Sequence, residues 1–125
     1  MVDSYSEVRI NMSKMLPKWR ELAEKNLDAG DEILVSYPGE LDREFGYLML
    51  SNRRLQFVHE EGFLRKAYKL TLDLPYEKIG KIYPKSKYEL DLTEREGKTH
   101  TFTTFEFPES IVEKRLKELM ESSHA

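Results

Sequence analysis

The sequence predicts a mainly β domain of the α+β class, in which seven short strands form the core and an amphipathic helix lies at each end of the chain. Two observations support this prediction. Apolar residues recur every three or four positions before Gly30 and every second position after it. Turn-forming residues then separate the alternating stretches at short, regular intervals, as in small sandwiches and barrels. A chain of 125 residues is the usual size of one such domain.

The composition narrows the classes of function. The chain is 39% hydrophobic and 34% charged, which is typical of a globular and strongly solvated protein. It contains no cysteine, so disulfide frameworks, thiolate metal sites and cysteine nucleophiles are excluded. Residues 1–10 lack the apolar centre of a signal peptide, and no stretch approaches the roughly 18 apolar residues of a membrane span. We therefore expect a cytoplasmic protein.

The N-terminal stretch predicts an amphipathic helix over about residues 13–28. Pro17 should lie near its first turn, where a missing N–H is tolerated, and Gly30 is a suitable C-terminal cap. Residues 1–30 therefore form a helical extension ahead of the strands. The apolar stripe of this helix consists of Met12, Met15, Leu16, Trp19, Leu22, Ala23 and Leu27.

Seven strands are expected between residues 31 and 107. The first should end at a turn formed by Pro38 and Gly39. The stretch from Phe45 to Leu50 is apolar on both faces, as in a strand that is covered twice, whereas residues 68–74 show the clearest alternation in the chain. The expected strands centre on residues 33–37, 45–50, 55–57, 68–74, 79–82, 88–92 and 99–107.

A second helix is predicted over residues 109–121. Pro108 suits a first helical position, or Ser110 with Glu113 forms a capping box, and both arrangements start the helix at nearly the same place. Leu116 belongs to its apolar stripe, and we expect this side chain to fill the mouth of the barrel. The strands and this helix define one domain over residues 31–121, within a single globular unit.

Two segments of this domain resemble a known family. Residues 46–57, which read Gly-Tyr-Leu-Met-Leu-Ser-Asn-Arg-Arg-Leu-Gln-Phe, resemble the hairpin between the second and third strands of GRAM-like and prokaryotic pleckstrin-homology (PH)-like domains. Residues 74–79, Leu-Pro-Tyr-Glu-Lys-Ile, resemble the step into that family's next strands. The resemblance covers about residues 31–121 and implies a partly open seven-stranded barrel of two antiparallel sheets, capped by the C-terminal helix.

The resemblance also bears on the ligand. In PH domains that bind phosphoinositides, basic residues cluster in the loop between the first two strands. The corresponding loop here, residues 37–44, contains three acidic residues and a single base, Arg43. Its charge is therefore opposite to that required for a phosphorylated headgroup.

We expect no enzymatic activity, no metal and no cofactor. The histidines are isolated from one another, and His59 and His100 should occupy solvent-facing or satisfied positions on strands. Carboxylates such as Glu60 and Glu106 should lie in turns or at the start of a helix. These places are solvated, whereas a catalytic carboxylate needs a cleft that shifts its pKa. The chain contains neither a GxGxxG motif nor a Walker loop.

A basic segment is the main polar feature of the sequence. Residues 53–87 carry a net charge of +5 between acidic flanks, although the whole chain carries −3. This charge is either a solvated face or a weak binding site for an anionic lipid or a nucleic acid, and the overall negative charge disfavours nucleic acid. For Arg53 an ion pair with a nearby carboxylate is the structural alternative. The candidate anion-binding residues are Arg53, Arg54, Arg65, Lys66 and Lys69.

The function that we expect is that of a non-catalytic adaptor module acting through protein–protein contacts, including contacts with itself. The apolar stripe of the N-terminal helix is too large to remain in water, so it packs either on the outside of its own barrel or on a second copy or partner. We favour a two-fold dimer, because that is the commonest way of closing such a patch. The residues expected to form this contact are Met12, Met15, Leu16, Trp19 and Leu22. Peripheral contact with an anionic membrane is the alternative function.

Overall fold

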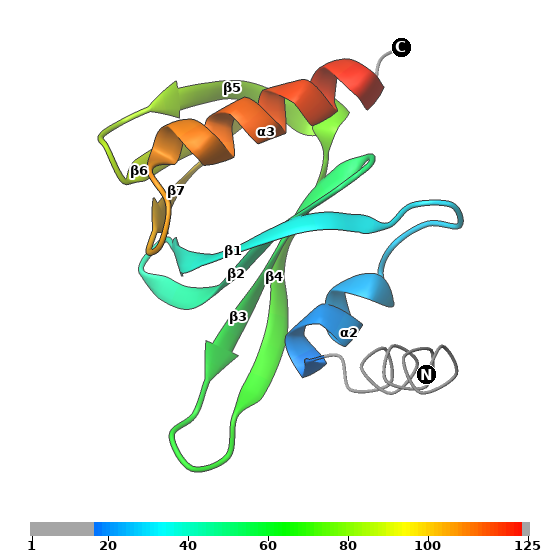
Figure 1. Ribbon diagram of the computed structural model, residues 1–125, viewed down its shortest axis with the longest axis vertical. Coiled ribbons are helices and arrows are strands. Elements are labelled where there is room, and N and C mark those ends of the chain that lie inside the picture. Colours follow the sequence, from blue (N-terminus) through cyan, green and yellow to red (C-terminus); the bar gives the residue numbers. More distant parts are fainter. Residues whose placement is uncertain (1–16, 124–125) are drawn as a thin grey trace, which may run out of the picture.

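The computed structural model describes residues 17–123, in which a strongly curved antiparallel sheet carries one helix on its outer surface and another across one end (Figure 1). The prediction of a mainly β, seven-stranded domain with a helix before and after the strands is confirmed. Neither described helix combines the length and the apolar character needed to cross a membrane. In chain order the elements are α2 (Lys18–Glu24), β1 (Ile33–Leu41), β2 (Glu44–Ser51), β3 (Arg54–Glu61), β4 (Ala67–Pro75), η1 (Tyr76–Lys78), β5 (Ile79–Pro84), β6 (Glu89–Glu94), β7 (Thr99–Thr104) and α3 (Glu109–Ser123).

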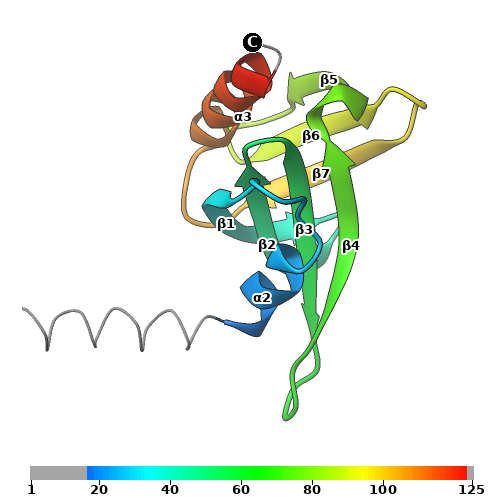
Figure 2. The same ribbon diagram turned by 90° about the vertical axis from the view of Figure 1, so that its right-hand side faces the viewer.

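All seven strands belong to one sheet with the order β4-β3-β2-β1-β7-β6-β5. Its two halves are joined by β1, which pairs with β2 along its length and with β7 through residues 39–41. The hydrogen-bonded sheet is therefore continuous, where two sheets were predicted. The edge strands β4 and β5 are consecutive in the chain and are joined by the three-residue η1, so the sheet curls until its edges approach one another without pairing (Figure 2).

The first hairpin differs from its predicted form. The turn expected at Pro38 and Gly39 is wrong, because β1 continues through both residues and the chain turns at Asp42 and Arg43, whose φ angles are 51° and 73°. A strand accepts proline where an adjacent edge is unpaired, and β1 has no β7 partner before Gly39. Asp42 also holds the turn, since its carboxylate accepts a hydrogen bond from the Thr101 N–H at 2.9 Å. The loop expected over this region is therefore mostly strand.

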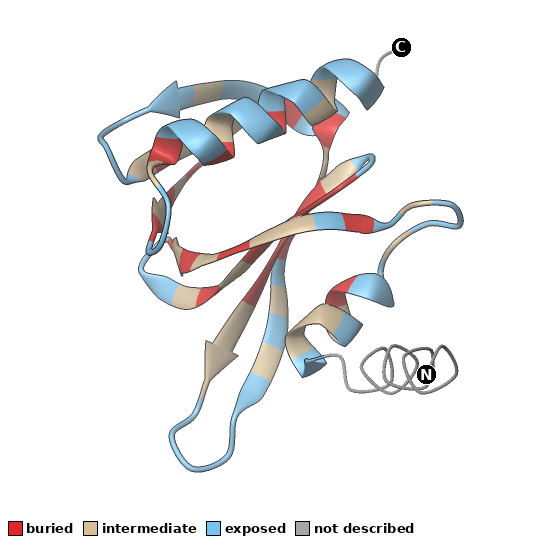
Figure 3. Cartoon of the chain, in the orientation of Figure 1, coloured by how far each residue is buried: buried red, intermediate tan, exposed pale blue. Residues whose placement is uncertain are grey.

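The main core lies inside the curve of the sheet, and every strand contributes to it. The rings of Phe57 and Phe102 meet edge to face, with their centroids 6.2 Å apart. α3 closes one end of this core with Val112 and Leu116, both fully buried (Figure 3). The predicted inward position of Leu116 is thus confirmed.

A second apolar cluster lies on the outer face of the sheet, beneath α2. Ala23 of α2 joins Met49 of β2 and Val58 of β3 in this cluster, and all three are fully buried. Gln56 is also buried, and its Nε2 donates a hydrogen bond to the Ala23 carbonyl at 3.0 Å, which connects the end of the helix to β3. The prediction that residues 45–50 form a strand covered on both faces is confirmed.

The N-terminal helix ends earlier than predicted. α2 begins directly after Pro17 and ends at Glu24, not near residue 28. Asn26 lies just beyond this end, and its side chain donates to the Leu22 carbonyl at 2.8 Å, competing with the main-chain N–H of a further turn. The predicted helix before residue 17 lies outside the described residues, as do Met12, Met15 and Leu16 of its predicted apolar stripe.

Two glycines allow adjacent strands to pack large rings against the backbone. A Cβ at Gly46 would collide with the Val58 carbonyl oxygen and would lie 2.9 Å from the ring of Phe57. A Cβ at Gly39 would collide in the same way with the Thr103 carbonyl oxygen. Close approach, not an unusual backbone angle, therefore requires glycine at both positions.

We expect Gly46→Ala to lower the free energy of unfolding by about 1–3 kcal/mol, because the added methyl group must displace strand backbone beside a packed core. Gly80→Ala is the matched control: Gly80 is exposed at an irregularity in β5, and the atom nearest to an added Cβ is the Arg95 Cα at 3.2 Å. Urea unfolding of the two variants compares these costs. Equal losses would contradict the close-approach explanation.

Candidate functional site

Arg54, one of the predicted anion-binding residues, is surrounded by carboxylates of its own chain. Its Nη2 lies 2.7 Å from Asp28 Oδ2, and its Nη1 lies 3.0 Å from Asp73 Oδ1. Its Nε is 3.8 Å from Oδ2 of Asp31, whose side chain is fully buried. Asp28 and Asp31 belong to the connection between α2 and β1, and Asp73 belongs to β4. Arg54 therefore ties this connection to the sheet.

The charge of Arg54 is already balanced within the protein. Burial by itself would lower the pKa of its guanidinium, but the hydrogen bond to Asp73 and the charges of Asp73, Asp28 and Asp31 raise that pKa above its ordinary value. Only 16% of the side chain is exposed. An external anion would compete with three fixed carboxylates, so this geometry favours a structural role. Anion binding by Arg54 stays a prediction.

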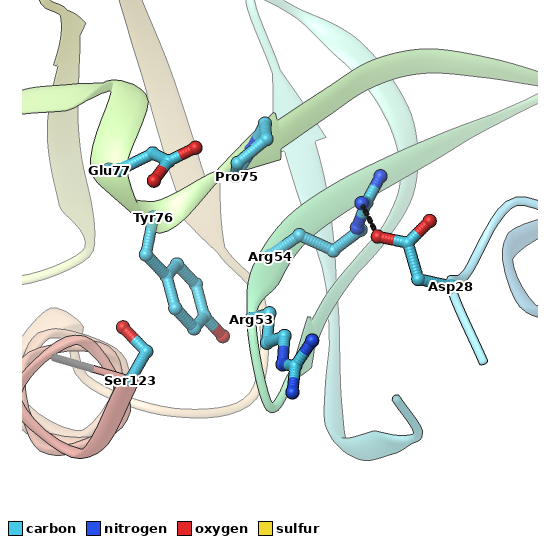
Figure 4. A pocket seen from close by; sticks show the side chains of 7 residues that line it. All are labelled: Asp28, Arg53, Arg54, Pro75, Tyr76, Glu77 and Ser123. Atoms are coloured by element: carbon cyan, nitrogen blue, oxygen red, sulfur yellow. Dashed lines mark hydrogen bonds and ion pairs between the residues drawn. The ribbon is translucent and has the colours of Figure 1, made fainter. Parts of the chain in front are cut away.

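Arg53 lines a hollow beside this cluster (Figure 4). Arg54 is directed toward Asp28 in this view, whereas Arg53 is drawn without a partner, and no carboxylate of residues 17–123 forms an ion pair with it. The acidic residues Asp28 and Glu77 offset the charge of the two arginines in the lining, so the hollow is not strongly positive. It has a volume of about 300 Å³ and is lined by Asp28, Arg53, Arg54, Pro75, Tyr76, Glu77 and Ser123.

The other three predicted anion-binding residues lie near the tip of the β3–β4 hairpin, at the opposite end of β3 from the two arginines. Lys66 Nζ lies 3.5 Å from Glu60 Oε1, and Lys69 Nζ lies 3.1 Å from Glu61 Oε1. Arg65 forms no ion pair with any described residue. The structure therefore brings these three residues together and separates them from the arginines at the start of β3.

The same tip contains two residues that the sequence analysis did not single out. Phe63 and Leu64 are adjacent in the connection between β3 and β4, and each is 94% exposed. The sequence did contain a signal, because a turn that follows Gly62 is usually polar and this one has an apolar pair beside two cations. The pattern of alternating apolar residues did not reveal this pair, because Phe63 and Leu64 belong to no strand.

Trp19 and Leu22, from the stripe predicted to mediate self-association, pack against the protein's own sheet. The ring of Trp19 stacks on Tyr47 of β2, with centroids 4.1 Å apart. Leu22 joins Tyr68 and Leu70 of β4 in the outer cluster. The described part of the stripe thus follows the intramolecular alternative, and self-association stays a prediction.

An apolar groove separates β5 from α3. Ile79 and Ile82 of β5 and Met120 of α3 supply its apolar lining, and the groove has a volume of about 310 Å³. Lys81, Lys117 and Glu121 supply charged groups to the same lining. Because β5 is an edge strand, one side of its backbone has no strand partner. The groove therefore combines apolar side chains with unpaired main-chain groups.

Exposed lysines follow β5 and the connection to β6. Two of them lie over tyrosine rings, Lys81 over Tyr83 at 5.6 Å and Lys87 over Tyr88 at 5.5 Å. The lysines that do form ion pairs in the described part of the chain belong to the hairpin tip and to α3. The lysines along β5 that have no carboxylate partner among the described residues are Lys78, Lys81, Lys85 and Lys87.

The described histidines have partners within the fold. His100 is buried, and its ring nitrogens lie 2.9 Å from Asp42 Oδ2 and 2.7 Å from Glu94 Oε2. The Nδ1 of His59 lies 2.8 Å from the Phe45 carbonyl oxygen. No group of three or more histidine or acidic side chains among the described residues is arranged to hold a metal ion. Both histidines thus occupy satisfied positions.

Glu109 is a buried carboxyl group at the start of α3. Burial raises its pKa to about 7, and the hydrogen bond to Glu113 and the charge of Glu113 act in the same direction. Glu113 accepts a hydrogen bond from Lys117 at 2.5 Å, which lowers the pKa of Glu113. A protonated Glu109 can therefore donate to the Glu113 carboxylate, and this proton is lost near neutral pH.

Comparisons with known proteins show a related fold and no function. No protein-family model and no curated protein matches this chain. It is similar to a crystal structure described as the C-terminal domain of an unknown protein from Leishmania infantum, with a TM-score of 0.56 and 17% sequence identity. The match covers 74% of this chain and 87% of that chain. Identity at this level shows a shared architecture alone.

We expect Arg54→Ala to lower the free energy of unfolding by about 2–4 kcal/mol at neutral pH, because it leaves the buried Asp31 carboxylate without its cation. The neighbouring Arg53→Ala is a matched control, and its effect should stay within about 0.5 kcal/mol because Arg53 is exposed. Urea unfolding measures both. Similar losses for the two variants would exclude the proposed structural role of the Arg54 cluster.

Replacing Glu109 with Gln should change how stability depends on pH. The pKa of Glu109 is raised in the folded state, so its contribution to stability is full below about pH 4.5 and is lost as pH rises through about 7. The variant keeps a donor for Glu113 and carries no charge. It should be more stable than the native protein by about 1–3 kcal/mol at pH 8, and this gain should shrink as pH falls toward 4.5. Urea midpoints measured across this range check the trend, and a gain that is independent of pH contradicts it.

Proposed function

We propose that this chain is a PH-like binding module that captures an extended segment of a partner protein along β5, in the groove between β5 and α3. One observation carries the proposal: an open strand edge coincides with an apolar groove at the same place in the fold. Edge strands without cover commonly pair with another chain. The proposed activity is recognition alone and includes no catalytic step.

Addition of a strand explains how such a segment would be held. Its main chain would form hydrogen bonds with the free edge of β5, and these bonds supply affinity without regard to sequence. Every second side chain would point into the groove, because side chains alternate across a strand. Ile79, Ile82 and Met120 offer apolar contacts for these side chains, and the absence of a side chain at Gly80 leaves room for them.

The charge around β5 favours an acidic partner. Lys81 lines the groove and Lys78, Lys85 and Lys87 lie nearby, and none of these four lysines pairs with a carboxylate among the described residues. Lys117 and Glu121 also line the groove, and Lys117 is already paired with Glu113. An acidic segment would neutralise these cations, and complementary charge of this kind raises specificity and the rate of association. A second copy of β5 would bring like charges together, which opposes self-pairing at this edge. The proposed ligand is therefore an extended segment with apolar and acidic residues in alternation.

The PH-like assignment is part of the proposal. It is supported by the two sequence segments that resemble this family, by the strand order in which β1 joins both halves of the sheet, and by a C-terminal helix that closes one end of the core. The similarity to the Leishmania infantum domain supports the architecture and does not indicate any ligand.

Selection of random peptides displayed on phage against the full chain tests the proposed function. Selected peptides should be extended, with apolar and acidic residues in alternation. Lys81→Glu should weaken their binding by about tenfold, because it reverses a charge at the groove. Lys98→Glu is the matched control, since Lys98 is also exposed but lies in the turn between β6 and β7.

Backbone amide shifts of the labelled protein then locate the binding site. Shifts concentrated in β5 and the last turns of α3 support the groove. If the selected peptides bind Lys81→Glu and Lys98→Glu equally well, or if the shifts fall elsewhere, the β5–α3 groove is not the site.

A further inference from the structure

The β3–β4 hairpin extends beyond the rest of the sheet. Pairing between β2 and β3 reaches only as far as Gly46 and His59, whereas β3 and β4 continue to the pair formed by Glu61 and Ala67. The last pairs of this hairpin therefore have no third strand beside them. Figure 2 shows the hairpin as a narrow projection that points away from α3.

The apex of this projection is apolar and uncovered. Phe63 and Leu64 are each 94% exposed, whereas no other large apolar residue in the described chain exceeds the 52% of Tyr83. Gly62 precedes them with a φ of 97°, and a Cβ at that position would collide with the Arg65 carbonyl oxygen, so the chain turns tightly there. The two exposed apolar residues thus lie together in a tight turn at the end of the hairpin.

Cations surround the apolar pair. Arg65 and Lys66 follow it directly, and Lys69 lies on the adjoining part of β4. Lys18 and Lys25 of the α2 region line a hollow of about 350 Å³ together with Lys66, and Glu21 is the acidic residue in this lining. The positive charge near the tip therefore comes from two elements that are far apart in the sequence.

The acidic residues of the hairpin are less exposed than its lysines. The side chain of Glu60 is 10% exposed, whereas that of its partner Lys66 is 57% exposed. Glu61 is 41% exposed, compared with 64% for its partner Lys69. An approaching surface therefore meets the cations first.

We propose that the tip of the β3–β4 hairpin inserts into anionic membranes. Phe63 and Leu64 enter the boundary between headgroups and acyl chains, and the cations around them contact the acidic headgroups. Apolar side chains beside clustered basic residues are the two features that hold proteins at such interfaces. Neither feature suffices alone, because a few cations bind weakly at physiological ionic strength and two apolar side chains bury little surface.

The shape of the tip distinguishes a membrane from a protein partner. A stable protein interface uses about 20–30 residues on each side and buries about 800 Å² per partner. The connection between β3 and β4 has only residues 62–66, and it is convex. A protein would need a matching cavity to receive it, whereas a fluid bilayer accepts a protruding apolar wedge without one.

This inference is independent of the proposed peptide groove. The hairpin tip and the α3–β5 region lie at opposite ends of the molecule (Figure 1). A module held at a membrane by the tip would therefore present β5 away from the bilayer, free to hold a partner.

Flotation of the full chain with vesicles tests the inference. The native protein should bind vesicles of phosphatidylcholine mixed with phosphatidylserine, and it should bind vesicles of phosphatidylcholine alone much more weakly. The double variant Phe63→Ala/Leu64→Ala should lose affinity for the mixed vesicles by about tenfold or more. Arg65→Glu/Lys66→Glu should lose binding to a similar extent.

Matched controls separate the tip from general changes in apolarity or charge. Leu34→Ala/Ile111→Ala removes two other exposed apolar side chains, 43% and 46% exposed, and should leave vesicle binding unchanged. Lys98→Glu/Lys114→Glu reverses two exposed charges elsewhere and should reduce vesicle binding far less than the reversals at the tip.

A fluorescent variant reports the depth of insertion directly. Phe63→Trp should be quenched by lipids with brominated acyl chains, whereas the native Trp19, which is stacked on Tyr47, should not be.

Three outcomes would overturn the inference. They are failure of the native protein to bind the mixed vesicles at low salt, binding that survives Phe63→Ala/Leu64→Ala, and absence of quenching in Phe63→Trp. Self-association of the native chain that is lost in Phe63→Ala/Leu64→Ala, without vesicle binding, would assign the tip to a second copy instead.

Discussion

Burial of β2 and β3 on both faces is the constraint on which the rest of this structure depends. The inner face of these strands supplies Leu48 and Phe57 to the main core, and the outer face supplies Met49 and Val58 to the cluster beneath α2. Without α2 this outer face would be exposed, and buried Gln56 would lose the carbonyl that accepts its hydrogen bond. The N-terminal helix is therefore part of the folded unit, even though the family resemblance begins after it.

The position of α2 explains why two similar arginines have different surroundings. Once the helix is docked, the connection that follows it passes the start of β3, where Asp28 and Asp31 meet Arg54. Arg53, the adjacent residue, remains exposed and has no such partner among the described residues. Arg54 thus lies in the structural cluster at the start of β3, whereas Arg53, in the turn that precedes this strand, is exposed to solvent.

Coverage of the central strands leaves both proposed binding surfaces at the margins of the sheet. α2 lies against the base of the β3–β4 hairpin, and α3 closes the opposite end of the core beside β5, so neither helix reaches the hairpin tip (Figure 1). The proposed peptide groove uses the free edge, and the proposed membrane contact uses the tip. Both are built from ordinary apolar and basic residues, which explains why no catalytic motif marks them in the sequence.

The sequence by itself determined the secondary structure and the order of its elements, because the period of apolar residues changes wherever a helix gives way to strands. It also identified residues 45–50 as covered twice. It misplaced the turn at Pro38 and Gly39, since the local turn signal of these residues is outweighed by pairing with β2 and β7. Only the tertiary structure decided which basic residues lie together. That outcome depends on strand register and on where the N-terminal helix docks, and both follow from contacts between residues far apart in the chain. For the same reason the groove between β5 and α3 and the exposure of Phe63 and Leu64 emerged only when the sheet had curled and its helices were in place.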